Sequence, residues 1–162
     1  MNDVIDRALH SATIPTRIEP TGLLRDSNLK PDEISLTPWS AGKPLAWEVI
    51  CAHPLAPSWT AIGTKSVSAV ANSVEKKKRN KYKDLEPNFH FEPVSVETLG
   101  GMGETTLLFI KQLGGKIAER TGESHSMTFF RQRLAIAIQV GNHACLAETL
   151  PSPGSSLPLT DF

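Results

Sequence analysis

Two acidic side chains in the segment KPDEISLTPWSAGKPLAWEVI, residues 30–50, could share a metal ion. Asp32 precedes a stretch in which polar and apolar residues alternate, and Glu48 lies within the nearly continuous apolar run 45–51. If the two stretches form a hairpin centred at Ser40, opposed residues have numbers that sum to 80, so Asp32 lies opposite Glu48. The Cβ atoms of opposed residues are roughly 4.5 to 5.5 Å apart, and two carboxylates at that separation favour a cation between them. The pair therefore predicts a site for Mg²⁺ or Mn²⁺.

The register of this hairpin decides the interpretation, because a shift of one residue would send the two side chains to opposite faces of the sheet. The alternative is a solvent-facing Asp32 at a strand entry and an unrelated Glu48 within a strand. Against it, Glu48 is flanked by apolar residues, and a charge in such surroundings is costly unless it has a partner. Both interpretations stay open on spacing alone.

A lysine-rich segment supplies the second candidate group. Residues 65–85 show helical periodicity, and continuing their apolar stripe leads to Lys78, Lys81 and Tyr82. An inward lysine either meets the acidic pair and steadies a phosphate or positions a water, or it belongs to a solvated charge run whose aliphatic stems pass the edge of the core. The stripe itself consists of Val67, Val70, Ala71 and Val74.

The elements that must position these groups alternate between helices and strands. One mixed sheet flanked by helices, an α/β fold, is the expected architecture. Residues 1–148 are expected to form the domain, and the Pro- and Ser-rich residues 149–162 a disordered tail. In chain order we expect a helix over the first dozen residues, strands at 16–19, 33–37 (ended by Pro38) and 45–51, a helix at 65–85, a strand at 89–97, and helices at 104–120 and 128–150.

Composition excludes some classes of protein. The chain has 162 residues, enough for one domain with a real core, and its 17 basic residues balance 17 acidic ones. The net charge therefore does not indicate nucleic-acid binding, although it does not exclude a local basic face. Cys51 and Cys145 lie in apolar stretches and are expected to be buried thiols in a reducing compartment. No secretory signal and no membrane span are recognised, which predicts an intracellular protein.

Two further features near the end of the last expected strand have competing interpretations. The residues Gly100-Gly101-Met102-Gly103 precede a helix; they either hold an anion at its N-terminus or form a plain strand-to-helix turn. Glu97 is either a third acidic group near the metal or a strand-end residue without that role.

The order of these elements, together with Lys30-Pro31-Asp32 and Glu48, resembles the PD-(D/E)XK restriction-like endonuclease fold. The closer similarity is to the version found after the reverse transcriptase in non-LTR retrotransposon-type proteins, which show Arg/Lys-Pro-Asp, a gap of a dozen or so residues, and Asp or Glu in the next strand. The resemblance covers about residues 2–148. It is carried by NDVIDRALHSATIPTRIEPTGLLR, KPDEISLTPWSAGKPLAWEV, EKKKRNKYKDLEPNFHFEPVSVETLG and FFRQRLAIAIQVGNHA.

The resemblance implies an α-β-β-β-α-β core and a DNA-nicking activity that depends on Mg²⁺ (or Mn²⁺). Asp32 and Glu48 match the metal-binding acids, and Lys78 or Lys81 matches the lysine that some members carry on the helix after the third strand. Position 50 is Ile, where the standard Glu-x-Lys tripeptide has its lysine. The implied partners are DNA and a reverse-transcriptase domain that is absent from this chain, and the implied location in a eukaryote is the nucleus. The alternative is a catalytically inactive remnant of the same fold, with at most DNA binding or an interaction function.

Overall fold

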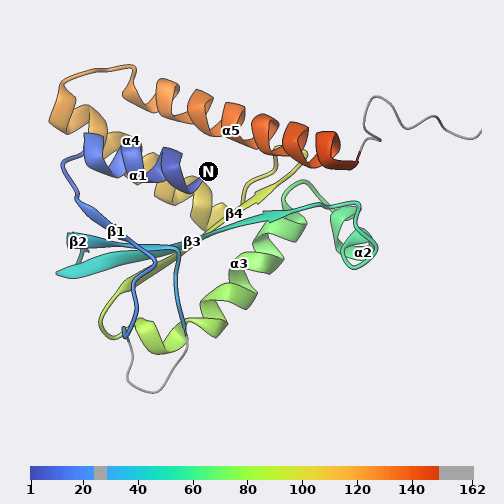
Figure 1. Ribbon diagram of the computed structural model, residues 1–162, viewed down its shortest axis with the longest axis horizontal. Coiled ribbons are helices and arrows are strands. Elements are labelled where there is room, and N and C mark those ends of the chain that lie inside the picture. Colours follow the sequence, from blue (N-terminus) through green and yellow to red (C-terminus); the bar gives the residue numbers. More distant parts are fainter. Residues whose placement is uncertain (24–28, 150–162) are drawn as a thin grey trace, which may run out of the picture.

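One mixed sheet forms the centre of the molecule (Figure 1). The structure is a computed structural model and describes residues 1–23 and 29–149. Its strands lie in the order β1-β2-β3-β4; the first two pairings are antiparallel, and β3 and β4 are parallel. The elements are α1 (Asn2–Ser11), β1 (Thr16–Ile18), β2 (Glu33–Ser40), β3 (Lys43–Ala52), α2 (Thr60–Gly63), α3 (Ala69–Lys81), the 3₁₀ turn η1 (Lys83–Leu85), β4 (His90–Glu97), α4 (Glu104–Thr121) and α5 (Ser126–Thr149). The expected order of helices and strands is confirmed, with the one-turn α2 added.

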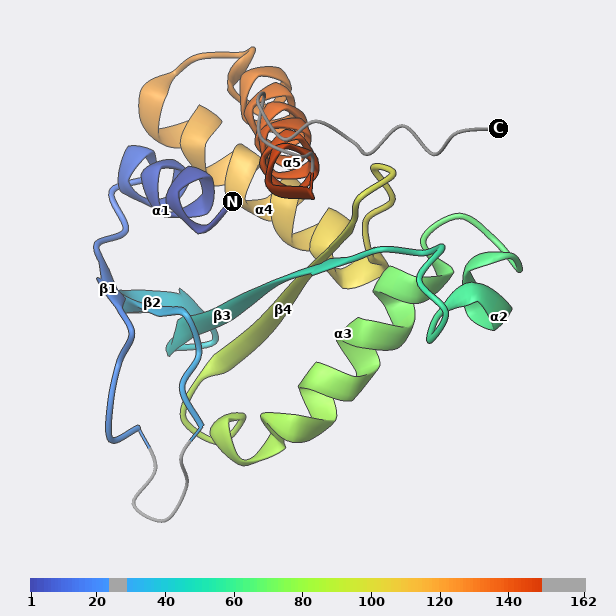
Figure 2. The same cartoon turned by 45° about the vertical axis from the view of Figure 1, so that its right-hand side comes forward.

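Helices cover both faces of the sheet, which explains why the middle of β3 is apolar at successive positions. In Figures 1 and 2, α3 lies along one face, whereas α1, α4 and α5 lie over the other. Side chains alternate between faces along a strand. Leu45 and Trp47 therefore join the core beneath α1 and α4, and Ala46 packs with Tyr82 and Phe91 on the α3 side. The parallel neighbours β3 and β4 are joined through α3, so the site residues of β3 lie under this crossover helix.

The turn between β2 and β3 differs from the expectation. Pro38 does not end β2, which continues to Ser40, and the chain reverses at Ala41 and Gly42, whose φ angles are 49° and 74°. A two-residue turn with both φ angles positive matches the right-handed twist of the strands. The pairing is irregular around Pro38, where proline offers no N–H to the ladder. Below this irregularity, Ile34 pairs with Ala46.

The prediction that both cysteines are buried is wrong, because Cys51 and Cys145 are exposed. Alternation along β3 sends Ile50 and Ala52 into a small core with Val70 of α3, so Cys51 faces the other way. The C-terminal helix runs to Thr149 without a break in its middle.

Two other predictions concern the chain ends and the membrane. Residues 150–162 of the expected tail lie outside the described part of the chain. Within residues 1–23 and 29–149, no helix is both long and apolar enough to cross a membrane.

Candidate active site

Asp32 lies directly before β2 and is fixed to β3 through both its backbone and its side chain. Its N–H donates to the carbonyl oxygen of Trp47 at 3.0 Å. Its Oδ2 accepts hydrogen bonds from the Val49 N–H at 2.8 Å and from Asn2 Nδ2 at 2.9 Å. The carboxylate thus extends the β2–β3 pairing by one interaction. The neighbouring pair, Glu33 with Trp47, has the register that places Asp32 opposite Glu48.

Glu48 on β3 forms an ion pair with Lys78, which lies on α3. Lys78 Nζ donates to Glu48 Oε1 at 2.8 Å, and the two side chains are only 26% and 15% exposed. The other oxygen, Oε2, is buried and accepts no hydrogen bond from the residues that the structure describes. An ion pair this far from solvent is screened less than a surface pair. Lys78 therefore neutralises Glu48 while leaving one acceptor oxygen free.

The helix α3 delivers Lys78 because its apolar positions pack on the sheet. Val70 and Val74 are buried, and Lys78 follows Val74 by one turn on the same face. Lys81 does not share this face: it is exposed, and its Nζ lies 5.0 Å from the ring centroid of Tyr82. The structure brings Lys78 to Glu48, whereas Lys81 lies against the Tyr82 ring.

The donor set fits a hard divalent cation in a limited way. Mg²⁺ commonly takes one or two carboxylates and completes its shell with water and phosphate oxygens. Asp32 and Glu48 would supply the carboxylates, and the unpartnered Oε2 of Glu48 is an available ligand atom. Among the described residues, no group of three or more His, Cys, Asp or Glu side chains could hold a metal ion. A cation here would depend on water and substrate for most of its ligands.

Tyr82, at the end of α3, lies at the site, and no role was predicted for it from the sequence. Its side chain is 1% exposed, and its hydroxyl donates to the carbonyl oxygen of Lys30 at 3.0 Å. Burial, the negative charges of Glu48 and Asp32, and the hydrogen-bonding influence of the Glu48 side chain together raise the pKa of Tyr82 to about 12. The apolar stripe does lead to position 82, but its contact with the Lys30 segment requires the tertiary structure.

Glu33 forms a second acidic group on the opposite face of the sheet. It is 3% exposed and shares the α1 side with Trp47. Burial raises its pKa from 4.5 to about 7, and the nearby carboxylates of Asp6, Asp32 and Asp3 contribute to the rise. The sequence does not predict that Glu33 lies close to the carboxylates of α1.

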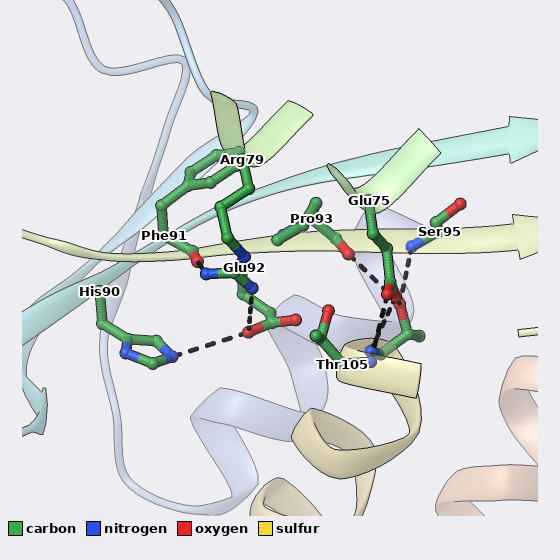
Figure 3. A network of polar contacts seen from close by, with 9 residues as sticks. Glu75, Arg79, His90, Phe91, Glu92, Pro93, Ser95 and Thr105 are labelled. Carbon is green, nitrogen blue, oxygen red and sulfur yellow. Dashed lines mark hydrogen bonds and ion pairs between the residues drawn. The ribbon is translucent and has the colours of Figure 1, made fainter. Parts of the chain in front are cut away.

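The helix N-terminus that follows the Gly-rich turn does bind an anionic group, which is the carboxylate of Glu75 from the protein itself. Glu75 of α3 accepts hydrogen bonds from the Thr105 N–H at 3.2 Å and from the Thr106 N–H at 3.0 Å (Figure 3). A Cβ at Gly103 would collide with this carboxylate. Glu97 acts similarly, since its Oε1 accepts from the Ala71 N–H at 3.0 Å in the first turn of α3. These carboxylates serve the helix N-termini, which accounts for Glu97 without a metal.

Arg79 connects α3 to the edge strand β4. Its guanidinium donates to the Phe91 carbonyl at 3.1 Å and lies 3.7 Å from Glu92, which His90 also approaches at 3.6 Å (Figure 3). Because β4 is the outermost strand, the Arg79 side chain can reach over its edge and cap a carbonyl that no further strand pairs with.

Glu48 and Lys78 thus meet on the α3 side of the sheet, and Asp32, next to Glu48 in the register, is held by the Val49 N–H and by Asn2 of α1. In proteins generally, carboxylates are ligands for divalent cations, and a neighbouring ammonium stabilises negative charge on a phosphate. Comparison with models of known protein families and with curated proteins finds no match to this chain.

Proposed function

We propose that this chain is a metal-dependent endonuclease domain that nicks DNA, of the PD-(D/E)XK kind that follows the reverse transcriptase in non-LTR retrotransposon-type proteins. The observation that supports it most is the contact of Lys78 with Glu48 beside Asp32. The acids and the lysine of that family's site are both represented, although the lysine comes from α3. A mixed four-stranded sheet with the matching element order provides the frame.

Each side chain has a definable task in phosphodiester hydrolysis. Asp32 and the free Oε2 of Glu48 would hold Mg²⁺ or Mn²⁺, and a bound ion of this kind lowers the pKa of its water and offsets charge on the scissile phosphate. Asp32 is oriented by the Val49 N–H and Glu48 by Lys78. The Lys78 ammonium also places a positive charge where the phosphate gains negative charge.

A plasmid-nicking assay tests the proposal. Supercoiled plasmid is incubated with the protein and Mg²⁺ or Mn²⁺, and conversion to the open circle is followed. Asp32→Asn and Lys78→Met should each lower the nicking rate by about 100-fold, the scale expected for losing one charge-stabilising group. Lys76→Met, on an exposed position of the same helix, is the matched control and should nick at nearly the normal rate. Nicking that survives Asp32→Asn would come from a contaminant and refute the assignment.

Transplanting the lysine tests the role of Lys78 more specifically. Ile50 follows Glu48 by two residues on β3, so both side chains lie on the same face. Adding Ile50→Lys to Lys78→Met restores the standard Glu-x-Lys tripeptide and should recover part of the lost activity. If the double variant is no more active than Lys78→Met, the ammonium is not what Lys78 contributes.

The assay also separates the second interpretation, a catalytically inactive remnant. One oxygen of Glu48 is already taken by Lys78, an arrangement that equally suits a purely structural ion pair. DNA binding that weakens steeply with salt, without nicking by the wild-type protein, would support this second reading.

A further inference from the structure

Tyr82 is the single tyrosine of the chain, and its ring is held in one place. The residue ends α3, and the ring stacks on Phe91 of β4 with centroids 4.3 Å apart and an interplanar angle of 20°. The ring is fully enclosed among Ile34, Ala46 and Leu85 of the same core cluster. A side chain this well packed presents its hydroxyl at a fixed point.

The hydroxyl contacts the chain just before the catalytic candidate Asp32. It donates to the carbonyl oxygen of Lys30, and only Pro31, which is buried, separates this carbonyl from Asp32. Proline fixes its own φ angle near −65°, so the two-residue link is stiff. Fixing the Lys30 carbonyl therefore restricts where the Asp32 carboxylate can lie.

The same helix end reaches both acids. The Tyr82 N–H donates to the Lys78 carbonyl at 2.9 Å, so the two side chains leave α3 one turn apart. Lys78 contacts Glu48 directly. The Tyr82 hydroxyl contacts the segment that carries Asp32 and also lies close enough to Glu48 for that carboxylate to raise its pKa. One turn of α3 therefore contacts both Glu48 and the segment before Asp32, and it helps to set the distance between the two acids.

We propose that Tyr82 is a positioning residue: its hydroxyl holds the Lys30-Pro31 segment against α3 and thereby seats the Asp32 carboxylate on the Val49 N–H. The consequence for metal binding rests on the proposed function. The placement of Asp32 does not, and it has a direct reporter, because the Val49 N–H donates to Asp32 Oδ2.

The experiment is amide hydrogen exchange on Tyr82→Phe, which removes the hydroxyl and keeps the stacked ring. The Val49 amide should exchange about 10-fold faster relative to the other amides of β3, since the carboxylate that protects it is released. Ser126→Ala is the matched control, because Ser126 is also buried and its hydroxyl also donates to a backbone carbonyl, that of Glu123 at 2.8 Å. In the control, Val49 should change only in step with its neighbours.

A second measurement, the affinity for Mn²⁺, separates the two proposals. If the wild type binds Mn²⁺, Tyr82→Phe should weaken binding by about 10-fold, the lower end of the effect of outer-shell partners, while the DNA concentration for half-maximal nicking stays unchanged. A wild type that neither binds Mn²⁺ nor nicks would overturn the proposed function, and Val49 exchange would still decide the role of Tyr82. Equal relative exchange of Val49 in Tyr82→Phe and Ser126→Ala would overturn that role.

Discussion

Replacing Glu33 with Gln should stabilise the protein at neutral and alkaline pH. Glu33 is almost fully buried, and its Oε2 has no hydrogen-bond partner among the described residues. Asp6, Asp32 and Asp3 surround it with negative charge. The ionised form is therefore unfavourable in the folded protein, whereas a neutral amide of the same shape avoids the charge and can still donate to a neighbouring carboxylate.

The magnitude follows from the pKa of Glu33, which rises from 4.5 to about 7 on folding. Between these values the folded protein binds more protons than the unfolded chain, so the free energy of unfolding falls as the pH increases. Well below pH 4.5 the carboxyl is protonated in both states and costs nothing; above about pH 7 the full cost applies. Each pKa unit corresponds to about 1.4 kcal/mol, which gives a total of about 3 kcal/mol.

Urea unfolding of wild type and Glu33→Gln at pH 4.5, 6 and 8, in EDTA to keep cations from Asp32, measures this difference. We expect nearly equal stability at pH 4.5, within about 0.5 kcal/mol, and an advantage of about 3 kcal/mol for the variant at pH 8. Glu119→Gln, an exposed position on α4, should leave the pH dependence unchanged. A constant difference between wild type and Glu33→Gln at all three pH values would show that Glu33 does not titrate in this range.

Two further substitutions test the packing around α3. Lys78→Met should cost about 1 to 3 kcal/mol in urea unfolding, because it leaves a partly buried carboxylate on β3 without its partner, while Lys76→Met should stay within about 0.5 kcal/mol; equal losses would make the ion pair energetically irrelevant. Gly103→Ala should cost about 2 to 4 kcal/mol, since the new Cβ meets the Glu75 carboxylate and expels it from the α4 N-terminus. Gly115→Ala on the same helix meets no atom within 4 Å and should stabilise by about 0.5 to 1 kcal/mol; a comparable gain for Gly103→Ala would contradict the close contact.

The register of the acidic pair was predictable from the sequence, although part of the reasoning was wrong. A turn centred at Ser40 gave pairs whose numbers sum to 80, and Ile34 does pair with Ala46. The observed turn instead pairs Ser40 with Lys43, whose numbers sum to 83. The register shifts on both sides of Pro38 change this sum from 83 at the turn to 80 at Ile34 and Ala46, next to the site. The alternation of apolar residues, which must place Trp47 in the core, fixed the register more strongly than the turn did.

Other parts of the site depend on contacts between distant segments, which local patterns do not encode. The sequence did not indicate that Glu75 and Glu97 each accept backbone N–H groups at a helix N-terminus, 26 to 31 residues away. The pKa of Glu33 depends on where α1 packs, and the role of Tyr82 depends on the return of the Lys30 segment to α3. Periodicity predicts which face of an element a residue occupies, but it does not predict which residue of another element it contacts.

The isoleucine at position 50 and the lysine on α3 are physically coupled. Ile50 packs against Val70 and Val74 on the α3 side of β3, and Lys78 lies one turn beyond Val74. An apolar side chain at position 50 therefore helps to seat the helix that carries Lys78 to Glu48. A lysine at position 50 would supply the ammonium from the strand but would place a charge under the helix, where burial without a partner is costly. In the proposed site, a strand lysine and a helix lysine would be alternative sources of the ammonium, and the packing of Ile50 against α3 favours the helix lysine.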